Sequence, residues 1–381
     1  MKIKWIRNKN GYTYTSDITQ AVSTVNWGGS TSQVARTAEI AVINAPDDKN
    51  VKKLKLRIAA GDVIKLYESG DLIFYGEVQT KEKKSESGTV TYSCTDLLSH
   101  LLRSTGVYNF SDTTAEGITK KVCADFEIET GTITETKATI KKMIIDGDAI
   151  YDIIMKAYTK AARQTGKKYI CRMNGSKLSV EVKGTKVKKF VLADEYNITN
   201  VTYQETIENM VNVVKIYDEK GKQIGEVKKD DWVKKYGIYQ QVYKKESGVN
   251  ETTAANNLLV GVEKKVNLDG INGDLKCIAG NGVEVYDKAT GLNGLFWIDS
   301  DTHTWENGTH VMSLELNFKN IMDSREDETT KEYTEAQIKA KSREEILELA
   351  DKLGYKMKTT KSSKKEDVVA DFMAQQAAEM A

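Results

Sequence analysis

The sequence has little proline and cysteine, and it has no long apolar run. Its 381 residues contain one proline, Pro46, so its turns must depend on the 27 glycines and on asparagine and aspartate. The four cysteines, Cys94, Cys123, Cys171 and Cys277, lie far apart and form no CxxC pair. This spacing favours buried thiols in a reducing cytoplasm over a zinc site. Because no run of about 18 apolar residues is present, we expect no membrane span.

The sequence also has no excess of either charge, and it has no pattern of a secretory signal peptide at residues 1–6. The 56 basic and 55 acidic residues leave a net charge of +1, which gives the whole chain no attraction to nucleic acid or an anionic membrane. Residues 1–6 lack the apolar core of a signal peptide, so we expect synthesis in the cytoplasm. Apolar residues make up 40% of the chain, enough for a buried core, and the length suits about two to four domains.

Motifs for catalysis, cofactor binding or metal binding are missing as well. Gly28-Gly29-Ser30 lacks the flanking glycine of a nucleophile elbow, and no GK[ST] follows Asn281-Gly282. Asp299-Ser300-Asp301 lacks the glycine and distal glutamate of an EF-hand loop. We therefore predict that the protein is not an enzyme and that it has no catalytic, cofactor-binding or metal-binding residues.

Two of the three histidines bracket a polar segment near the end of the strand-rich region. They are His303 and His310, and the segment holds Asp299, Asp301, Trp305 and Glu306; the third histidine is His100. A metal or acid–base site is one interpretation, and a polar hairpin tip is the other. The hairpin tip is favoured because the pair lacks the i, i+4 spacing of a helical metal site.

Two stretches 219 residues apart are nearly the same. Gly61-Asp62-Val63-Ile64-Lys65-Leu66-Tyr67-Glu68 matches Gly280-Asn281-Gly282-Val283-Glu284-Val285-Tyr286-Asp287. An aromatic apolar run follows each, and then a third alternating segment. The order predicts two hairpins that each continue into a third strand, with Tyr67 and Tyr286 equivalent. Chance similarity of short strands is the alternative. The repeat favours two related β-domains in one chain.

The remaining segments show alternating strand patterns and helical patterns. Strands are expected at 2–7, 37–43, 62–67, 72–80 and 89–94, with a charged hairpin tip at Lys81–Ser87. Helices are expected at 96–102 and 114–126, and a third from about 150 with Asp148 as its cap. A hairpin follows around Asn174-Gly175. Strands at 210–217 and 223–227 and a helix at 252–265 precede the second copy of the repeat.

The last 60 residues or so have a different composition. Glu326 to Asp351 is acidic, whereas Lys352 to Lys365 has six lysines and no acidic residue. Ser342 with Glu345 and Ser363 with Glu366 have the spacing of capping boxes, with Gly354 ending the first helix. The pattern predicts helix, extended loop, helix after an acidic linker. The lysines could contact phosphates, but a solvated loop is the more common case.

Two tryptophans could be exposed anchors for a partner. They are Trp27, followed by Gly28-Gly29, and Trp232. Burial in the core is the more common role of such residues, and it is the interpretation we favour.

In the order of these features the chain resembles the baseplate hub proteins of contractile phage tails, in particular the XkdQ/YqbQ-like proteins of defective PBSX-type prophages. The resemblance covers roughly residues 1–322. It involves the N-terminal strand with Trp5, the Gly61–Gly76 hairpin, the helix and hairpin of Gly147–Val182, and the run Gly280–Phe318 with Trp297-Ile298. The C-terminal segment departs from this pattern and is similar to helix–loop–helix modules of the SAP/HeH/LEM-like or Rho N-terminal kind.

The resemblance implies an α+β fold, mainly β, with two related tube-type antiparallel β-barrels. The expected domains are a first barrel (1–96), an α+β insertion (97–195), a second barrel (196–323), an acidic linker (324–333) and the helical module (334–381). A homotrimer would then present six modules in a pseudo-sixfold ring.

Such a ring would be a structural hub between a sixfold tail tube and a threefold central spike, in a phage tail or a tail-like bacteriocin. The expected partners are the tube protein, the spike protein, other baseplate or wedge proteins and the tape measure protein. The Lys81–Ser87 and Asp299–Asn307 tips are the candidate contacts. The alternatives are a hub-associated enzyme that degrades cell wall and an accessory protein that binds nucleic acid through the C-terminal module, which the acidic linker argues against.

Overall fold

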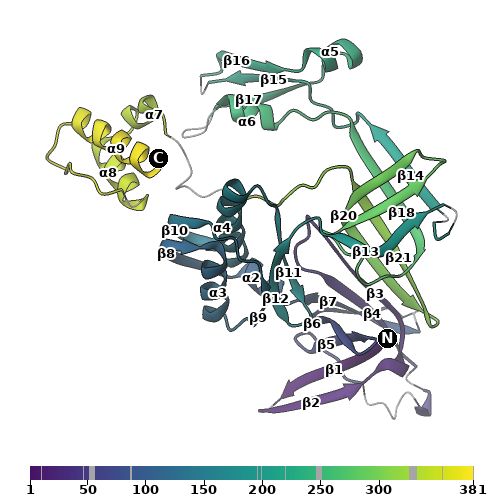
Figure 1. The fold of residues 1–381 in the computed structure, drawn as a ribbon. Coiled ribbons are helices and arrows are strands. Elements are labelled where there is room, and N and C mark those ends of the chain that lie inside the picture. Colours follow the sequence, from purple (N-terminus) through teal and green to yellow (C-terminus); the bar gives the residue numbers. More distant parts are fainter. Residues whose placement is uncertain are drawn as a thin grey trace.

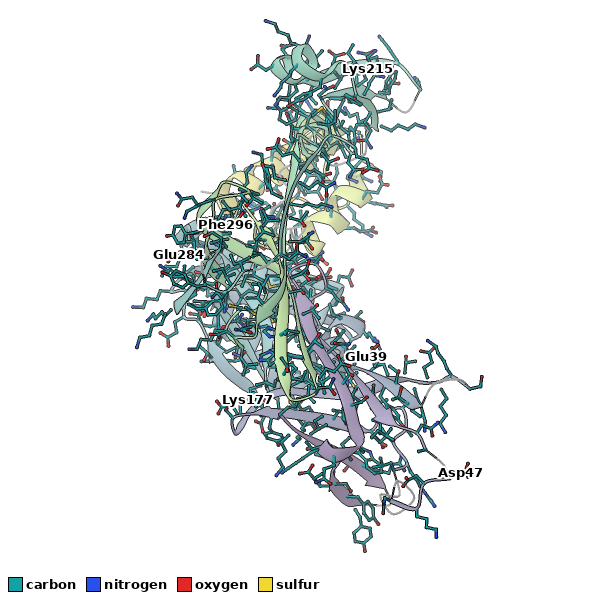
Figure 2. All side chains as sticks on the ribbon, turned by 90° about the vertical axis from the view of Figure 1, so that its right-hand side faces the viewer. Glu39, Asp47, Lys177, Lys215, Glu284 and Phe296 are labelled. Atoms are coloured by element: carbon teal, nitrogen blue, oxygen red, sulfur yellow. The ribbon has the colours of Figure 1, made fainter. Side chains whose placement is uncertain are left out.

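The structure is a computed structural model, and it describes most of the chain. The described residues are 1–9, 11–45, 47–50, 56–85, 88–194, 196–198, 200–218, 220–245, 251–325, 333–353 and 355–380. They form a mainly β protein with helices in three places (Figure 1), which confirms the predicted fold class. Seen from the side, Lys215 and Asp47 lie at opposite ends of an elongated molecule (Figure 2).

The first β-unit comprises the strands before residue 97. They are β1 (Lys2–Lys9), β2 (Tyr12–Asp17), β3 (Val22–Ser30), β4 (Thr37–Ile43), β5 (Val63–Glu68), β6 (Asp71–Lys83) and β7 (Thr89–Asp96), with a 3-10 turn η1 at Thr19–Ala21. Five of these strands were predicted from alternation of apolar and polar residues, and β2 and β3 were not. On β7 and β4 the alternating residues point into one core that includes Ile40 and Tyr92.

The second β-unit comprises six strands. They are β13 (Lys186–Ala193), β14 (Asn200–Thr206), β18 (Glu263–Asn272), β19 (Gly282–Asp287), β20 (Leu292–Glu306) and β21 (Thr309–Asn317). They enclose a separate apolar core built on residues such as Val283, Phe296 and Leu314.

The predicted repeat is visible in the pairing of the strands. In both units a hairpin, β5–β6 or β19–β20, is followed by a third antiparallel strand, β7 or β21. Tyr67 and Tyr286 are each the penultimate residue of the first hairpin strand, which confirms that they are equivalent. The outer neighbours differ, because β1 is antiparallel to β5 whereas β13 is parallel to β19.

The two β-units share one sheet. Its order is β14-β18-β21-β20-β3-β4-β7-β6-β5-β1-β2, with β13 and β19 attached beside β20. The two halves join where β20 pairs with β3. We call this pairing the seam.

An α+β unit lies between the two β-units in the chain. Its elements are α2 (Leu98–Arg103), β8 (Thr105–Thr114), α3 (Ala115–Asp125), β9 (Thr130–Ile133), β10 (Thr139–Ala149), α4 (Ile150–Thr165), β11 (Tyr169–Asn174) and β12 (Lys177–Val182). The predicted hairpin at Asn174-Gly175 is confirmed. The predicted cap of α4 is wrong: Ala149 is the N-cap residue, and the Asp148 carboxylate instead accepts a hydrogen bond from Lys156 Nζ at 2.7 Å.

A small unit is inserted between β14 and β18. It contains β15 (Val213–Tyr217), β16 (Gln223–Lys228), α5 (Asp230–Tyr236), β17 (Gln240–Lys244) and α6 (Glu251–Asn257). The predicted helix at 252–265 is therefore too long. Val260 forms a bridge with Val211 and β18 begins at Glu263, because pairing with distant strands outweighs the local helical pattern.

Three helices end the chain, and none of the described helices is long and apolar enough to cross a bilayer. They are α7 (Glu335–Lys339), α8 (Arg343–Lys352) and α9 (Lys365–Met380), and they pack around their own core with Phe372 at its centre. The Ser342–Glu345 capping box is confirmed. At the second predicted box, Ser363 with Glu366, the Ser363 hydroxyl accepts a hydrogen bond from the Thr360 amide, and α9 begins two residues later. Gly354 lies outside the described residues.

Candidate assembly interface

The seam is a continuous antiparallel pairing of seven residues on each strand. It runs from Ser300 opposite Ser30 to Glu306 opposite Thr24 without a register shift. Trp305, from the second β-unit, is part of the first unit's apolar core. The two units are therefore fused through backbone hydrogen bonds and a shared core, rather than tethered by a linker.

Glycine at position 28 is required by how closely the strands approach each other. A Cβ atom on Gly28 would lie 2.5 Å from the Asp301 carbonyl oxygen, and one on Gly29 would lie 2.9 Å from Arg36 Cγ. Trp27 is 5% exposed. The Trp27-Gly28-Gly29 segment thus belongs to the seam and is no free anchor, which agrees with the favoured interpretation. Trp232 is half-buried against Gly261.

A buried ion pair crosses the seam. The Arg36 guanidinium donates two parallel hydrogen bonds to the Asp301 carboxylate, at 2.9 and 2.5 Å, and the Asp301 side chain is 0% exposed. The Ala279 amide donates a third hydrogen bond to Asp301 at 2.7 Å. The guanidinium also lies over the Trp27 ring, 4.0 Å from its centroid. Such a bidentate pair fixes the geometry of both units as well as contributing energy.

His303 and His310 meet at the seam. His303 Nε2 lies 3.2 Å from the Cys277 carbonyl oxygen, so this nitrogen must be the donor. In a neutral ring Nδ1 is then the acceptor, and His310 Nε2 donates to it across 3.0 Å. Burial lowers the pKa of His303 to about 4, partly opposed by Asp301, and burial lowers that of His310 too. At neutral pH both rings are uncharged.

Aromatic packing completes this cluster. The ring centroids of Trp27 and His303 are 5.1 Å apart, and those of Trp305 and His310 are 4.0 Å apart. The described residues contain no group of three or more metal-ligating side chains. The cluster contributes hydrogen bonding and ring packing between the two units.

The prediction of an exposed hairpin tip at Asp299–Asn307 is therefore wrong. Residues up to Glu306 belong to β20 and lie in the seam, and only Asn307-Gly308 form the turn. The Lys81–Ser87 segment differs: β6 continues to Lys83, and residues 81–85 are exposed. Residues 86 and 87 lie outside the described residues. Residues 300–306 thus pair with β3, whereas among the described residues, 81–85 pair with no strand on the equivalent side, where Lys81 Nζ donates a hydrogen bond to the Ile58 carbonyl at 2.8 Å.

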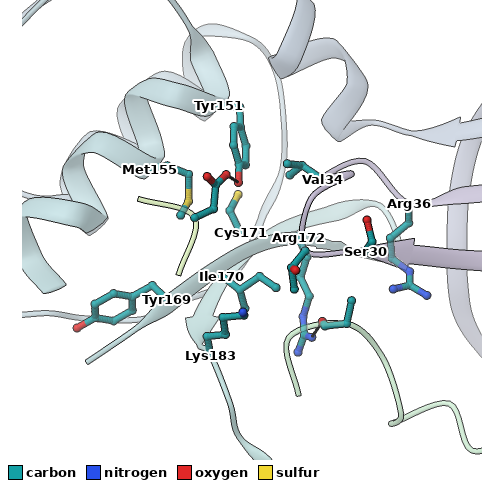
Figure 3. Close-up of a pocket in the computed structure, with 13 residues that line it drawn as sticks. Ser30, Val34, Arg36, Tyr151, Met155, Tyr169, Ile170, Cys171, Arg172 and Lys183 are labelled. Carbon is teal, nitrogen blue, oxygen red and sulfur yellow. Dashed lines mark hydrogen bonds between the residues drawn. The ribbon is translucent and has the colours of Figure 1, made fainter. Parts of the chain in front are cut away.

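A small cavity lies where the α+β unit meets both β-units (Figure 3). Its volume is about 30 Å³, enough to hold at least one water molecule. Tyr151 donates a hydrogen bond to Asp323 at 2.9 Å, and burial lowers the pKa of Lys183, whose Nζ donates to the Ile321 carbonyl. Burial raises the pKa of the Cys171 thiol well above its usual value, so this thiol is not a ready nucleophile. The contacts hold residues 321–323 against the α+β unit.

The comparisons with known proteins place the chain in a family. The model of the YQBQ-like family matches residues 25–317, more than half of the chain. The solved structures with the same fold include the 43 kDa tail protein of prophage MuSo2 from Shewanella oneidensis, with a TM-score of 0.57, 13% identity and coverage of 83% of this chain and 98% of that one. A tail protein from Neisseria meningitidis MC58 gives a TM-score of 0.53 at 14% identity, covering 83% and 95%.

The fold is thus that of prophage tail proteins. The chain belongs to the YQBQ-like family. It is 27% identical to the uncharacterized protein YqbQ of Bacillus subtilis (strain 168) over 275 residues, which is 69% of this chain and 83% of YqbQ. It is 26% identical to the phage-like element PBSX protein XkdQ of the same strain over 310 residues, or 78% of this chain and 93% of XkdQ. The resemblance inferred from the sequence is confirmed at the level of the family.

Proposed function

We propose that the protein is the structural hub of the baseplate in a contractile phage tail or a tail-like bacteriocin. Three copies form a pseudo-sixfold ring that joins the sixfold tail tube to the threefold central spike. One observation supports this most: each chain contains two β-units with the same hairpin-plus-strand order, joined edge to edge in one sheet. Two such modules in each of three chains supply six similar positions around an axis.

The role is architectural and not enzymatic. The polar candidates from the sequence, Asp301, His303 and His310, make structural contacts at the seam. Asp301 pairs with Arg36, and His303 is hydrogen-bonded to His310. The fold is shared with tail proteins, and the chain is similar in sequence to a protein of the phage-like element PBSX. The hub is assembled in the bacterial cytoplasm and becomes part of the particle, where it contacts tube, spike, wedge and tape measure proteins.

The proposed division has the first barrel at 1–96, the α+β insertion at 97–195 and the second barrel at 196–323, and a linker at 324–333 leads to the helical module at 334–381. The C-terminal apolar cluster supports the last boundary, since it contains only residues from Tyr333 onward. At the end of the insertion, β13 packs into the core of the second barrel. We propose that this module, similar to SAP/HeH/LEM-like modules, docks on a protein. A gel shift of the full chain with DNA at near-physiological salt tests the nucleic-acid alternative.

Deletion of the gene from the prophage tests the hub function directly. Induced cells lacking the chain should yield no complete tails in electron micrographs, and the wild-type gene supplied in trans should restore them. Complete tails that differ only in their ability to degrade peptidoglycan would instead support the enzyme alternative.

A further inference from the structure

The seam uses one edge of each β-unit, and among the described residues several other edges have no partner strand, including those of β2, β13 and β14. The shared sheet ends at β14, which pairs only with β18. On β6, pairing with β5 stops at Glu77, while pairing with β7 continues to Lys83. The outer half of β6 therefore has a free edge on the β5 side. Unpaired edges are sites where another strand can add.

This free edge of β6 corresponds to the edge of β20 that β3 occupies. Next to β5, the Gly61 amide bonds to the Val78 carbonyl at 2.9 Å and the Val78 amide to the Asp62 carbonyl at 2.8 Å. Next to β19, Gly280 and Asn281 make the same two bonds with Ile298, at 2.8 and 2.9 Å. One residue later, at Gln79 and at Asp299, both strands have a register shift. Thr80 therefore corresponds to Ser300, and Lys81 to Asp301.

The free edge of β14 corresponds to the edge of β3 that faces β20. Trp27 lies opposite Ala38, which lies opposite Cys94 of β7. In the second unit, Tyr203 lies opposite Val266, which lies opposite Leu316 of β21. Because β7 and β21 are the equivalent third strands, Tyr203 is the counterpart of Trp27.

We propose that β6 of one copy pairs with β14 of a second copy of this chain, in the register of the seam. The two strands would lie at the ordinary spacing of an antiparallel sheet, wider than in the seam, because Gln204 and Glu205 stand where the seam has Gly28 and Gly29. This rests on the proposed trimer and specifies its subunit interface. The pairing is antiparallel. The opposed residues are Thr80 with Thr206, Lys81 with Glu205, Glu82 with Gln204, Lys83 with Tyr203, and Lys84 with Thr202.

The side chains on these two edges are complementary. Lys81 takes the place of Asp301, the acidic partner in the seam, and it faces Glu205. Lys83 takes the place of His303 and faces Tyr203, as His303 packs on Trp27. An ammonium group over a tyrosine ring is a favourable contact. In the single chain Lys81, Lys83 and Glu205 are all exposed, so a second copy can reach them. Lys81 Nζ donates a hydrogen bond to the Ile58 carbonyl, and Glu205 pairs with Lys264 and accepts from Tyr203, so the new contact would be added to or exchanged for these.

The geometry of this contact leads to a ring. Each copy would offer β6 to one neighbour and β14 to another, which is a head-to-tail contact. Such contacts close into a ring when the rotation between copies divides a full turn. Seams within and between chains then alternate around the ring, and each β-unit keeps both neighbours.

A disulfide cross-link tests the register. The Thr31 amide bonds to the Asp299 carbonyl, so Thr302 and Gly28 are a non-hydrogen-bonded pair, and Glu82 and Gln204 should be one too. Their Cα atoms would be about 4.5 Å apart, within the range for a disulfide. The double variant Glu82→Cys/Gln204→Cys, assembled into particles and oxidised, should yield covalent trimers on a non-reducing gel. The four native cysteines are buried and should not interfere.

The matched control is Glu82→Cys/Tyr203→Cys, because a shift of one residue places the two thiols on opposite faces of the sheet. Particles with three copies that cross-link equally in both variants, or in neither, would overturn the register but leave the hub function standing. Particles with another number of copies would overturn the hub function itself.

A charge exchange provides a second test that needs no cysteine. Lys81→Glu and Glu205→Lys should each reduce the yield of particles, and the double variant should restore it, since the opposed charges are then exchanged. Failure of the double variant to exceed both single variants, with all three folded by circular dichroism, would overturn the proposed pairing.

Discussion

Asp301 connects the two β-units through a carboxylate that water does not reach. It accepts hydrogen bonds from Arg36 and from the Ala279 amide, and it lies 3.5 Å from His303. Removing one partner of a buried ion pair leaves the other charge uncompensated, which is more harmful than losing the attraction alone.

Asp301→Asn should therefore lower the free energy of unfolding by about 3–5 kcal/mol. Urea denaturation of the purified chain measures this. Glu129→Gln is the control, because its pair with Lys177 is exposed on both sides and its loss should leave the unfolding midpoint nearly unchanged. Equal midpoints for both variants would contradict a structural role for the buried pair.

Two buried groups, His303 and Asp96, should change the free energy of unfolding in opposite directions as the pH falls. The pKa of His303 is lowered to about 4, so its contribution is lost as the pH falls from about 6.5 to 4. Burial raises the pKa of Asp96 to about 7, so its contribution increases over much of that same fall. Asp96→Asn removes the second effect. Its denaturation midpoint should fall more steeply between pH 6.5 and 4 than that of the wild type, and parallel curves would contradict this assignment.

The strands of the seam depend on a backbone approach that only glycine permits. Gly28→Ala should destabilise the chain by about 1–3 kcal/mol, because its Cβ would overlap the Asp301 carbonyl oxygen. Thermal denaturation with hydrogen exchange at β3 and β20 measures this. Gly88→Ala is the matched control, since no atom lies within 4 Å of its Cβ position. Unchanged exchange at β20 in Gly28→Ala would contradict the assignment.

The C-terminal helices should behave as a separate element. The core around Phe372 draws only on residues from Tyr333 onward, and Gln376 bonds to both backbone groups of Tyr333. Limited proteolysis should cut first between Ser324 and Thr334 and release two resistant fragments, identified by intact mass. Early cleavage within β3 or α9 instead would show that the division is elsewhere.

Sequence patterns predicted the hairpins, whose two strands are adjacent in the sequence. They missed β3, which pairs with a strand far along the chain. The β5–β6 and β19–β20 hairpins are marked by turn residues and alternation. Strand β3 was missed because glycines at 28 and 29 weaken its strand pattern. Its partner β20 lies more than 260 residues further along the chain. For the same reason the Asp299–Asn307 segment was predicted as a hairpin tip, although residues 300–306, His303 among them, pair with β3 and only Asn307-Gly308 form the turn.

Among the strand edges left unpaired in the described part of the chain, those of β6 and β14 are complementary, and the basic one can be tested by charge reversal. Replacing Lys81, Lys83 and Lys84 with glutamate should leave folding nearly intact, because these side chains are exposed and only the hydrogen bond from Lys81 to the Ile58 carbonyl and its contact with the Tyr92 ring are lost. It should impair particle assembly, since Lys81 would then repel Glu205. The control replaces Lys222, Lys228 and Lys229, exposed in the small unit, with glutamate. Normal particle yield from the first variant, measured by electron microscopy, would show that β6 is not part of the joint.

A cryo-EM map of the assembled particle tests the central claim most directly. The account predicts three copies of the chain between tube and spike, with six β-units around the axis and β6·β14 pairings alternating with β3·β20 seams. A subunit interface that holds a tail together should bury on the order of 2,000 Å² or more. A map with six copies, or with the chain away from the junction of tube and spike, would contradict it.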